Sequence, residues 1–155
     1  MDLAKTLKIE SVWRLHPTPP LQIRSTQSVA DAVALMRMEQ VGCLLIYQEN
    51  RMVGIFTERD LVRRVLAVGK PLTVPVCECM TAAPVVVHKQ EPISGAIRRM
   101  EEGGYRHLPV IDEGGRVVGV LSVKRIVHYL AEHFPATIYN LPPDPRVVQQ
   151  DREGA

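Results

Sequence analysis

The sequence predicts an α+β fold in which two β-α-β-β-α repeats are related by pseudo-two-fold symmetry. The first observation is a duplicated stretch: residues 53–61 (Val-Gly-Ile-Phe-Thr-Glu-Arg-Asp-Leu) return as residues 118–126 (Val-Gly-Val-Leu-Ser-Val-Lys-Arg-Ile). The second is that the similarity extends upstream, where the apolar residues of segment 32–36 match those of segment 96–100; the copies keep one offset up to the turn, and the second gains a glycine after the position of Asn50. An internal repeat restricts the whole fold. We therefore expect two similar units that share one core.

The repeats divide the chain into four parts. These are a lead-in (1–18), a first repeat (19–70), a second repeat (71–133) and a proline-rich tail (134–155). A length of 155 residues suits one domain or two closely packed halves. We expect the lead-in to pack a short helix on the body through Leu3, Leu7 and Val12.

In the first repeat, residues 21–24 are the first strand candidate. Ser28 followed three residues later by Asp31 is a helix-start signal. Spacing of i, i+3, i+4 and i+7 predicts the buried face of that helix, which comprises Val29, Ala32, Val33 and Met36. Two apolar runs, 43–47 and 52–56, flank a polar turn and predict a β-hairpin.

The second repeat follows the same order. Residues 85–87 are its first strand candidate, and residues 108–111 and 117–121 flank a glycine-containing turn typical of a hairpin. The helix between them is predicted to bury Ile93, Ala96, Ile97 and Met100.

Each repeat is predicted to close with an amphipathic helix that starts at a hydroxyl residue, Thr57 or Ser122. The inward residues are expected to be Leu61, Val62, Val65 and Leu66 in the first helix, and Ile126, Val127, Tyr129 and Leu130 in the second.

Composition excludes several function classes. A formal net charge of +2 is too small to indicate nucleic-acid binding, and one Trp with two Phe do not make a base-stacking platform. No apolar run reaches the ~18 residues of a membrane span. Without a secretory signal and with three cysteines in no disulfide pattern, we expect a cytoplasmic protein that binds no membrane.

No catalytic or metal-binding constellation stands out. Cys77 and Cys79 are separated by one residue, whereas zinc sites use C-x₂₋₄-C with a second ligand pair. Phosphate-binding loops, dinucleotide fingerprints and nucleophile elbows are absent from the sequence. We therefore expect no enzyme activity, no cofactor and no metal.

Thr57 and Asp60 lie at a predicted strand-to-helix turn. Free N–H groups at such a turn favour anionic ligands, and a carboxylate there can accept from the two hydroxyls of a ribose. The alternative is a capping box, in which the acid reaches back to the helix start. The second copy keeps Ser122 but places Arg125 where Asp60 stands, which indicates that the two halves differ in chemistry.

Arg106, His107 and Lys124 stand at the mouths of apolar runs in the second repeat. Together they could gather a phosphate, Arg through its planar fork and Lys as a point charge. The alternative is a solvated rim of the molecule.

The duplicated pattern resembles a tandem pair of CBS domains (cystathionine β-synthase domains), called a Bateman module. The resemblance covers about Leu15 to Glu132 and rests on residues 53–61, 105–112 and 118–126. The chain is similar to stand-alone prokaryotic CBS-pair proteins. The resemblance implies a regulatory, ligand-sensing module that binds an adenosine nucleotide (AMP, ADP or ATP) between the repeats.

The resemblance also implies site residues. The family motif G-h-x-T-x-x-D matches Gly54, Thr57 and Asp60, with Asp60 expected on the ribose hydroxyls. The base would rest on Pro84, Val85 and Val86 beside Ile55, and the phosphates on Arg106, His107 and Lys124.

The second cleft departs from the family pattern, because Arg125 replaces the ribose acid and Gly42-Cys43 stands where the second copy has Arg106-His107. We expect one adenosine-nucleotide site per chain. The second cleft is expected to be empty or to hold something different, near Ile23, Arg24, Ser122 and Arg125.

CBS pairs commonly dimerise through their helices, and two-fold dimers are the commonest oligomers. The expected homodimer faces are Leu61, Val65, Ile126 and Leu130. Ile138, Tyr139 and Leu141 would anchor the tail on the body or a partner, and the last ~10 residues would fray. The alternative function is a non-sensing dimerisation and interaction protein that docks on an enzyme or transporter. The protein partner is not identified by the sequence.

Overall fold

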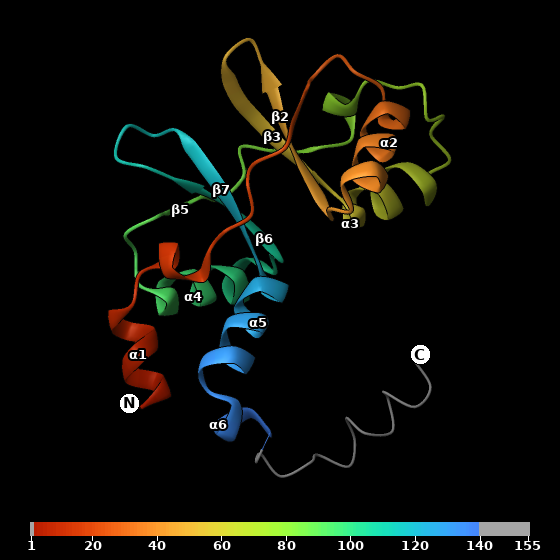
Figure 1. Cartoon of the computed structure of the whole chain (residues 1–155). Helices are drawn as coiled ribbons and strands as arrows, with labels where there is room; N and C mark the ends of the chain where they lie inside the picture. The colour runs from red at the N-terminus through yellow and green to blue at the C-terminus, as the bar shows by residue number, and fades with distance from the viewer. Residues whose placement is uncertain (1, 140–155) are drawn as a thin grey trace.

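The computed structural model describes residues 2–139, in which two sheets are each packed against two helices (Figure 1). The first sheet has the order β1 (Gln22–Arg24), β2 (Cys43–Gln48), β3 (Arg51–Thr57), β4 (Thr81–Ala82), and the second has β5 (Val87–His88), β6 (His107–Ile111), β7 (Val117–Ser122). In each sheet the first strand pairs in parallel with the second, which pairs antiparallel with the third. This arrangement confirms the predicted α+β class and the β-α-β-β-α order.

The helices occupy equivalent places in the two repeats. The first repeat has α2 (Val29–Glu39) and α3 (Glu58–Asp60), which continues as a π-helical segment (Leu61–Leu66); the second has α4 (Ile93–Gly103) and α5 (Val123–His133). Outside the repeats lie α1 (Leu3–Ile9) and the short α6 (Pro135–Tyr139). Within residues 2–139, no helix has the length and apolar character needed to cross a membrane.

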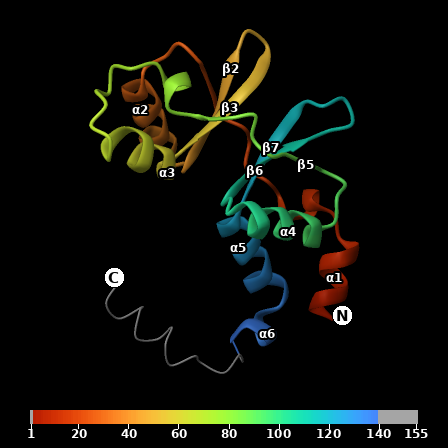
Figure 2. The same cartoon turned by 180° about the vertical axis from the view of Figure 1, so that it is seen from behind.

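The two hairpins lie side by side between the helix layers, as both views show (Figures 1 and 2). Their contact is a small buried cluster in which Cys43, Leu45 and Ile55 of the first sheet meet Val120 of the second. Each repeat also has a core of its own between its sheet and helices. The shared cluster holds the repeats face to face.

Each sheet is bordered by the segment that leads into the other repeat. Thr18, ahead of the first repeat, exchanges two backbone hydrogen bonds of 3.0 and 2.9 Å with Val120 in β7 of the second. In the same way β4, which precedes the first strand of the second sheet (β5), pairs with β3 of the first repeat. The lead-in also enters the second core, where Val12 is 0% and Leu15 is 1% exposed.

Three helices begin as their sequences predict. Ser28 and Thr57 each form a capping box with the acid three residues later. The Ser122 hydroxyl accepts from the backbone N–H of Arg125 at 3.1 Å. Side-chain oxygens at these positions satisfy N–H groups that have no partner within the helix.

The predicted inward faces of the closing helices are wrong in part. Val62, Leu66 and Val127 are 56%, 58% and 58% exposed, although we expected them to be buried. The π-helical turn places only the row of Leu61 and Val65 toward the sheet. The row beside it, with Val62 and Leu66, therefore faces away.

Burial also contradicts the expected dimer faces, which were predicted to be exposed. Val65 is 0% and Ile126 is 6% exposed, and both belong to the cores of their own repeats, with Leu61 and Leu130 packed against these cores. Side chains that fill a repeat's core have little surface left for a second chain. The predicted anchoring and fraying of the tail fall outside the side chains that the structure describes.

Candidate functional site

A cavity of about 1120 Å³ opens between the two repeats and is lined by residues of both. Its walls include the end of α2, the end of β3 with α3, the segment after β4, the end of α4 and the start of α5. In Figure 1, α3 and the start of α5 lie on the sides of the two repeats that face each other. Interfaces between similar units are common places for ligand pockets.

Asp60 is the most strongly held polar side chain of the cavity and is 5% exposed. Its Oδ2 accepts from the Thr57 N–H at 3.0 Å and from the Thr57 hydroxyl at 3.1 Å. Its Oδ1 accepts from the Thr81 hydroxyl at 3.1 Å and lies 3.3 Å from Arg64 Nε. The capping box thus forms, and the same carboxylate faces the cavity.

Arg64 also links this carboxylate to the segment between the repeats. Its Nη1 donates to the Met80 carbonyl at 3.0 Å while its Nε approaches Asp60. A ribose hydroxyl that reaches Asp60 Oδ1 would share this oxygen with Arg64 and Thr81, or displace one of them. A ligand bound at Asp60 would therefore change the contacts that Arg64 and Asp60 make with residues 80 and 81.

The apolar part of the lining contains three of the four residues expected to hold a base. Ile55, Pro84 and Val85 line the cavity. Val86 does not, because its carbonyl accepts a hydrogen bond from Arg99 Nη1 of α4 and the chain turns there into the second repeat. The Val86 expectation is therefore corrected.

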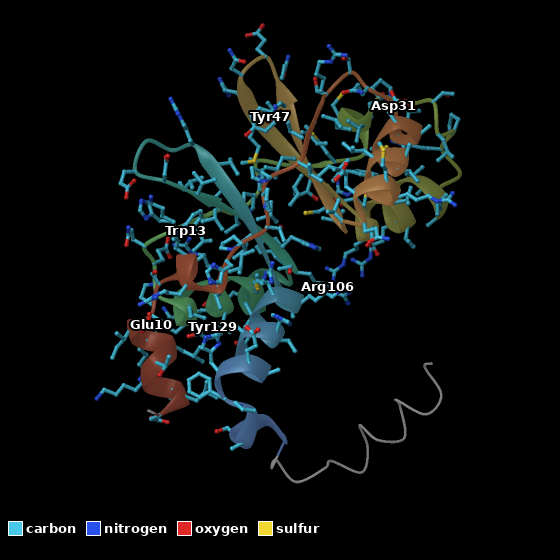
Figure 3. All side chains as sticks on the ribbon, in the orientation of Figure 1. Glu10, Trp13, Asp31, Tyr47, Arg106 and Tyr129 are labelled. Atoms are coloured by element: carbon cyan, nitrogen blue, oxygen red, sulfur yellow. The ribbon has the colours of Figure 1, made fainter. Side chains whose placement is uncertain are left out.

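The three expected phosphate-binding residues, Arg106, His107 and Lys124, all line the cavity. Figure 3 shows Arg106 at the edge of the second repeat that faces α3. Burial lowers the pKa of His107 below its usual value, the Arg106 guanidinium lowers it further, and the Glu58 carboxylate opposes both. His107 is thus held toward its neutral form.

Glu58 and His107 approach each other across the repeats above Gly42. A Cβ on Gly42 would lie 3.0 Å from Glu58 Oε1 and 3.4 Å from His107 Nε2, so glycine leaves room for both side chains. Burial, and then the nearby Glu58 charge, raise the pKa of the Cys43 thiol to about 12. Only a thiolate is nucleophilic, so this cysteine is an inert packing group.

Of the four residues expected at the second cleft, two line the cavity described above and two do not. Ser122 and Arg125 line the same cavity as Asp60. Ile23 and Arg24 do not line it: pairing of Ile23 with Ile46 turns the Ile23 side chain into the first core, where it is 7% exposed, and Arg24 faces solvent. The starts of α3 and α5 therefore line the same cavity.

Sequence reasoning missed several charged residues of the lining. Seven Lys or Arg side chains line the cavity against two acids, Glu58 and Asp60; the seven are Arg37, Arg59, Arg63, Arg64, Arg106, Lys124 and Arg125. The net +5 of this lining exceeds the +2 of the whole chain. One signal was available, because Arg59 occupies in the first copy the place of Lys124 in the second.

Arg59 also crosses between the repeats, since its Nη1 donates to the Gly104 carbonyl at the end of α4 over 3.0 Å. Among residues 2–139, no three His, Cys, Asp or Glu side chains gather closely enough to hold a metal ion. The cationic lining of the cavity suits an anion.

Comparison with known proteins agrees with this geometry. The CBS domain family matches residues 12–67 and 76–132, in tandem. The chain is 30% identical over 122 residues to an uncharacterized 17.7 kDa protein of Acidianus ambivalens, which covers 78% of this chain and 73% of that protein. It is 34% identical over 105 residues to the meiotically up-regulated gene 70 protein of Schizosaccharomyces pombe, which covers 67% of this chain and 14% of that protein.

Among solved structures, a CBS domain pair in complex with 5′-methylthioadenosine and S-adenosyl-L-methionine is similar at 26% identity and a TM-score of 0.73, over 80% of this chain and 98% of that one. The fold and the repeated site define a CBS-domain protein. The chain belongs to the CBS domain family and contains two CBS domains in tandem.

Proposed function

We propose that the chain is a regulatory module that senses an adenosine nucleotide in the cavity between its CBS domains. The observation that carries the proposal is Asp60: a buried carboxylate, fixed by four contacts, at the wall of a cavity that is otherwise strongly cationic. It supplies acceptors for ribose hydroxyls, and the surrounding cations supply donors for phosphate. The similar CBS pair with two adenosine derivatives supports the adenosine part.

The cavity charge favours a phosphorylated ligand over S-adenosylmethionine. A lining of +5 repels the sulfonium cation of that molecule and attracts a phosphate ester. Ile55, Pro84 and Val85 provide the apolar surface on which a base packs. The combination selects a nucleotide such as AMP, ADP or ATP.

Sensing follows from contacts that cross between the repeats. Arg59 bonds the Gly104 carbonyl, and Asp60 bonds Thr81 in the connecting segment. A nucleotide that replaces some of these contacts favours one arrangement of the repeats over another. It shifts the equilibrium only by its difference in affinity for the two arrangements.

A thermal-shift series with AMP, ADP, ATP, S-adenosylmethionine and GTP tests the proposal. Ligand at 100 times its dissociation constant adds ~2.7 kcal/mol, which raises the midpoint of a chain of this size by ~5–10 °C. Asp60→Ala should abolish the shift. Asp31→Ala is the matched control, because Asp31 forms the same capping box with Ser28 but lies at the start of α2, away from the cavity (Figure 3).

If Asp31→Ala and Asp60→Ala are both destabilised but only Asp60→Ala loses the shift, the carboxylate holds the ligand. No shift with any nucleotide on the unmodified chain would exclude the sensor. The remaining candidate would then be a non-sensing interaction protein that docks on an enzyme or transporter.

The homodimer is part of the proposal, with a corrected interface. Val62 and Val127 occupy the same position in the two copies and are 56% and 58% exposed. Leu66 and Val123 add exposed apolar surface beside them. Exposed apolar side chains on equivalent helices of a pseudo-symmetric chain suit a two-fold interface.

A further inference from the structure

Asp60 and Arg125 occupy equivalent positions at the starts of two helices. The backbone N–H of Asp60 donates to the Thr57 hydroxyl at 3.2 Å, and that of Arg125 donates to the Ser122 hydroxyl at 3.1 Å. Both residues line the one cavity between the repeats. The two helix starts therefore present the same backbone to the ligand, with opposite side-chain charge.

Arg125 cannot hold a ribose in the way Asp60 does, because a guanidinium has five N–H donors and no acceptor. It is half-buried in the cavity wall, and Lys124 lies beside it. The salt bridges among residues 2–139 include Arg64 of the cavity cations but neither Lys124 nor Arg125. The charges of Lys124 and Arg125 are therefore not taken up by a salt bridge within the described residues.

The volume of the cavity is also sufficient for a nucleotide together with an extended phosphate chain. Pockets that bury a whole drug-sized ligand span roughly 300–1,000 Å³, and this cavity is about 1120 Å³. With the ribose at Asp60 and the base on Ile55, Pro84 and Val85, the phosphate chain is the part of the nucleotide that remains to meet Arg125 in the same cavity. A second nucleotide at Arg125 would lack a ribose acceptor equivalent to Asp60.

We propose that Arg125 makes its half of the cavity a subsite for the terminal phosphates, so that the chain prefers ATP and ADP over AMP. This inference rests on the proposed adenosine-nucleotide site and determines its specificity. Arg forms forked, charge-assisted hydrogen bonds with phosphate oxygens, which Lys124 supports as a point charge. The exchange of Asp for Arg between the repeats is thus a change from a sugar subsite to a phosphate subsite.

Isothermal titration of AMP, ADP and ATP into four chains tests the inference. The chains are the unmodified protein, Arg125→Ala, Arg125→Lys and Arg98→Ala. Arg98 is an exposed residue of α4 that does not line the cavity, so Arg98→Ala removes the same charge elsewhere. The readout is the ratio of the ATP and AMP dissociation constants, together with the number of ligands bound per chain.

We expect one nucleotide per chain and an ATP preference that Arg125→Ala lowers on the order of tenfold, the loss typical of a hydrogen bond to a charged group. Arg125→Lys should keep part of the preference, and Arg98→Ala all of it. Tighter binding of AMP than ATP, an unchanged ratio in Arg125→Ala, or two AMP molecules per chain would overturn the inference while leaving the nucleotide site intact. Absence of all nucleotide binding would overturn both proposals.

Discussion

The hydroxyl of Thr81 donates to Asp60 Oδ1 over 3.1 Å, so the segment between the repeats is bonded directly to the proposed ribose site. Thr18 holds the equivalent edge position beside β7, but its hydroxyl donates to the Val120 carbonyl at 3.2 Å. The difference follows from Arg125, which has no acceptor to offer. The symmetry of the backbone is retained, and that of the polar contacts is lost.

Thr81→Val should weaken nucleotide binding as well as folding. The substitution keeps the shape but removes one donor to Asp60, which costs about 1 kcal/mol of unfolding free energy. Thr18→Val removes the equivalent hydroxyl without touching Asp60. Urea unfolding and nucleotide titration of both variants should show similar losses of stability and a loss of affinity in Thr81→Val alone. Equal affinities would show that Thr81 does not position the carboxylate.

Gly54→Ala should displace Met80 and Thr81, because Gly54 in β3 lies against them. A Cβ on Gly54 would lie 2.3 Å from Met80 Sδ and 2.9 Å from the Thr81 carbonyl oxygen. The backbone oxygen cannot move without separating β3 from β4, and overpacking of this kind costs about 1–3 kcal/mol. We expect a lower urea midpoint and weaker nucleotide binding.

Gly95→Ala is the control for the glycine substitution. Gly95 lies inside α4, and its Cβ would meet only Glu91 Oε2, at 3.5 Å. Alanine in a helix interior is favoured over glycine by about 0.5–1 kcal/mol. This variant should be as stable as the original chain or more so; a loss equal to that of Gly54→Ala would contradict the assigned clash.

Without added nucleotide, the free energy of unfolding should fall as the pH is lowered from about 6.5, the ordinary pKa of a histidine such as His107. Burial lowers the pKa of His107 in the folded chain, so the unfolded chain binds a proton first and acidification favours unfolding. Urea unfolding between pH 5 and pH 8 measures the slope. His107→Asn should make this slope smaller, and an equal slope in the variant would assign the pH dependence to other groups.

Val62→Glu combined with Val127→Glu should separate the proposed homodimer, because both side chains are exposed on equivalent helices and a buried charge without a partner is costly. Sedimentation velocity measures the change in mass. Ile9→Glu introduces the same charge at a 61% exposed position of α1 and should leave the assembly unchanged. A dimer that persists in the double variant would place the interface elsewhere.

Local signals were sufficient to predict most helices and both hairpins. The caps at Ser28, Thr57 and Ser122 depend on residues within one turn, and the hairpins on alternating apolar runs and short turns. The strand β4 was missed because its two residues pair with β3 across a long loop, and no local pattern encodes that pairing. The π-helical segment was missed because its apolar spacing also fits an ordinary helix.

The site was predictable where the two copies could be compared position by position. The contrast between Asp60 and Arg125 was identified in this way, and Arg59 could have been found by the same comparison with Lys124. Arg106 and Lys124 were selected instead from their places beside apolar runs and from the family pattern. Ser122 and Arg125 line the same cavity as Asp60, and this depends on how the two sheets pack through Cys43 and Val120. That packing is a long-range property, which neither copy encodes alone.

The sheet of each repeat is bordered by the segment that leads into the other repeat, and this arrangement has a consequence for folding during synthesis. Val12 and Leu15 are synthesised before the second repeat, but their buried places lie in the core that contains Val87 and Leu108 of that repeat. Nascent chain that ends after the first repeat must keep this apolar segment exposed or covered by other factors. The unit that repeats in the sequence is therefore not the unit that folds, and neither half is complete until the other has been synthesised.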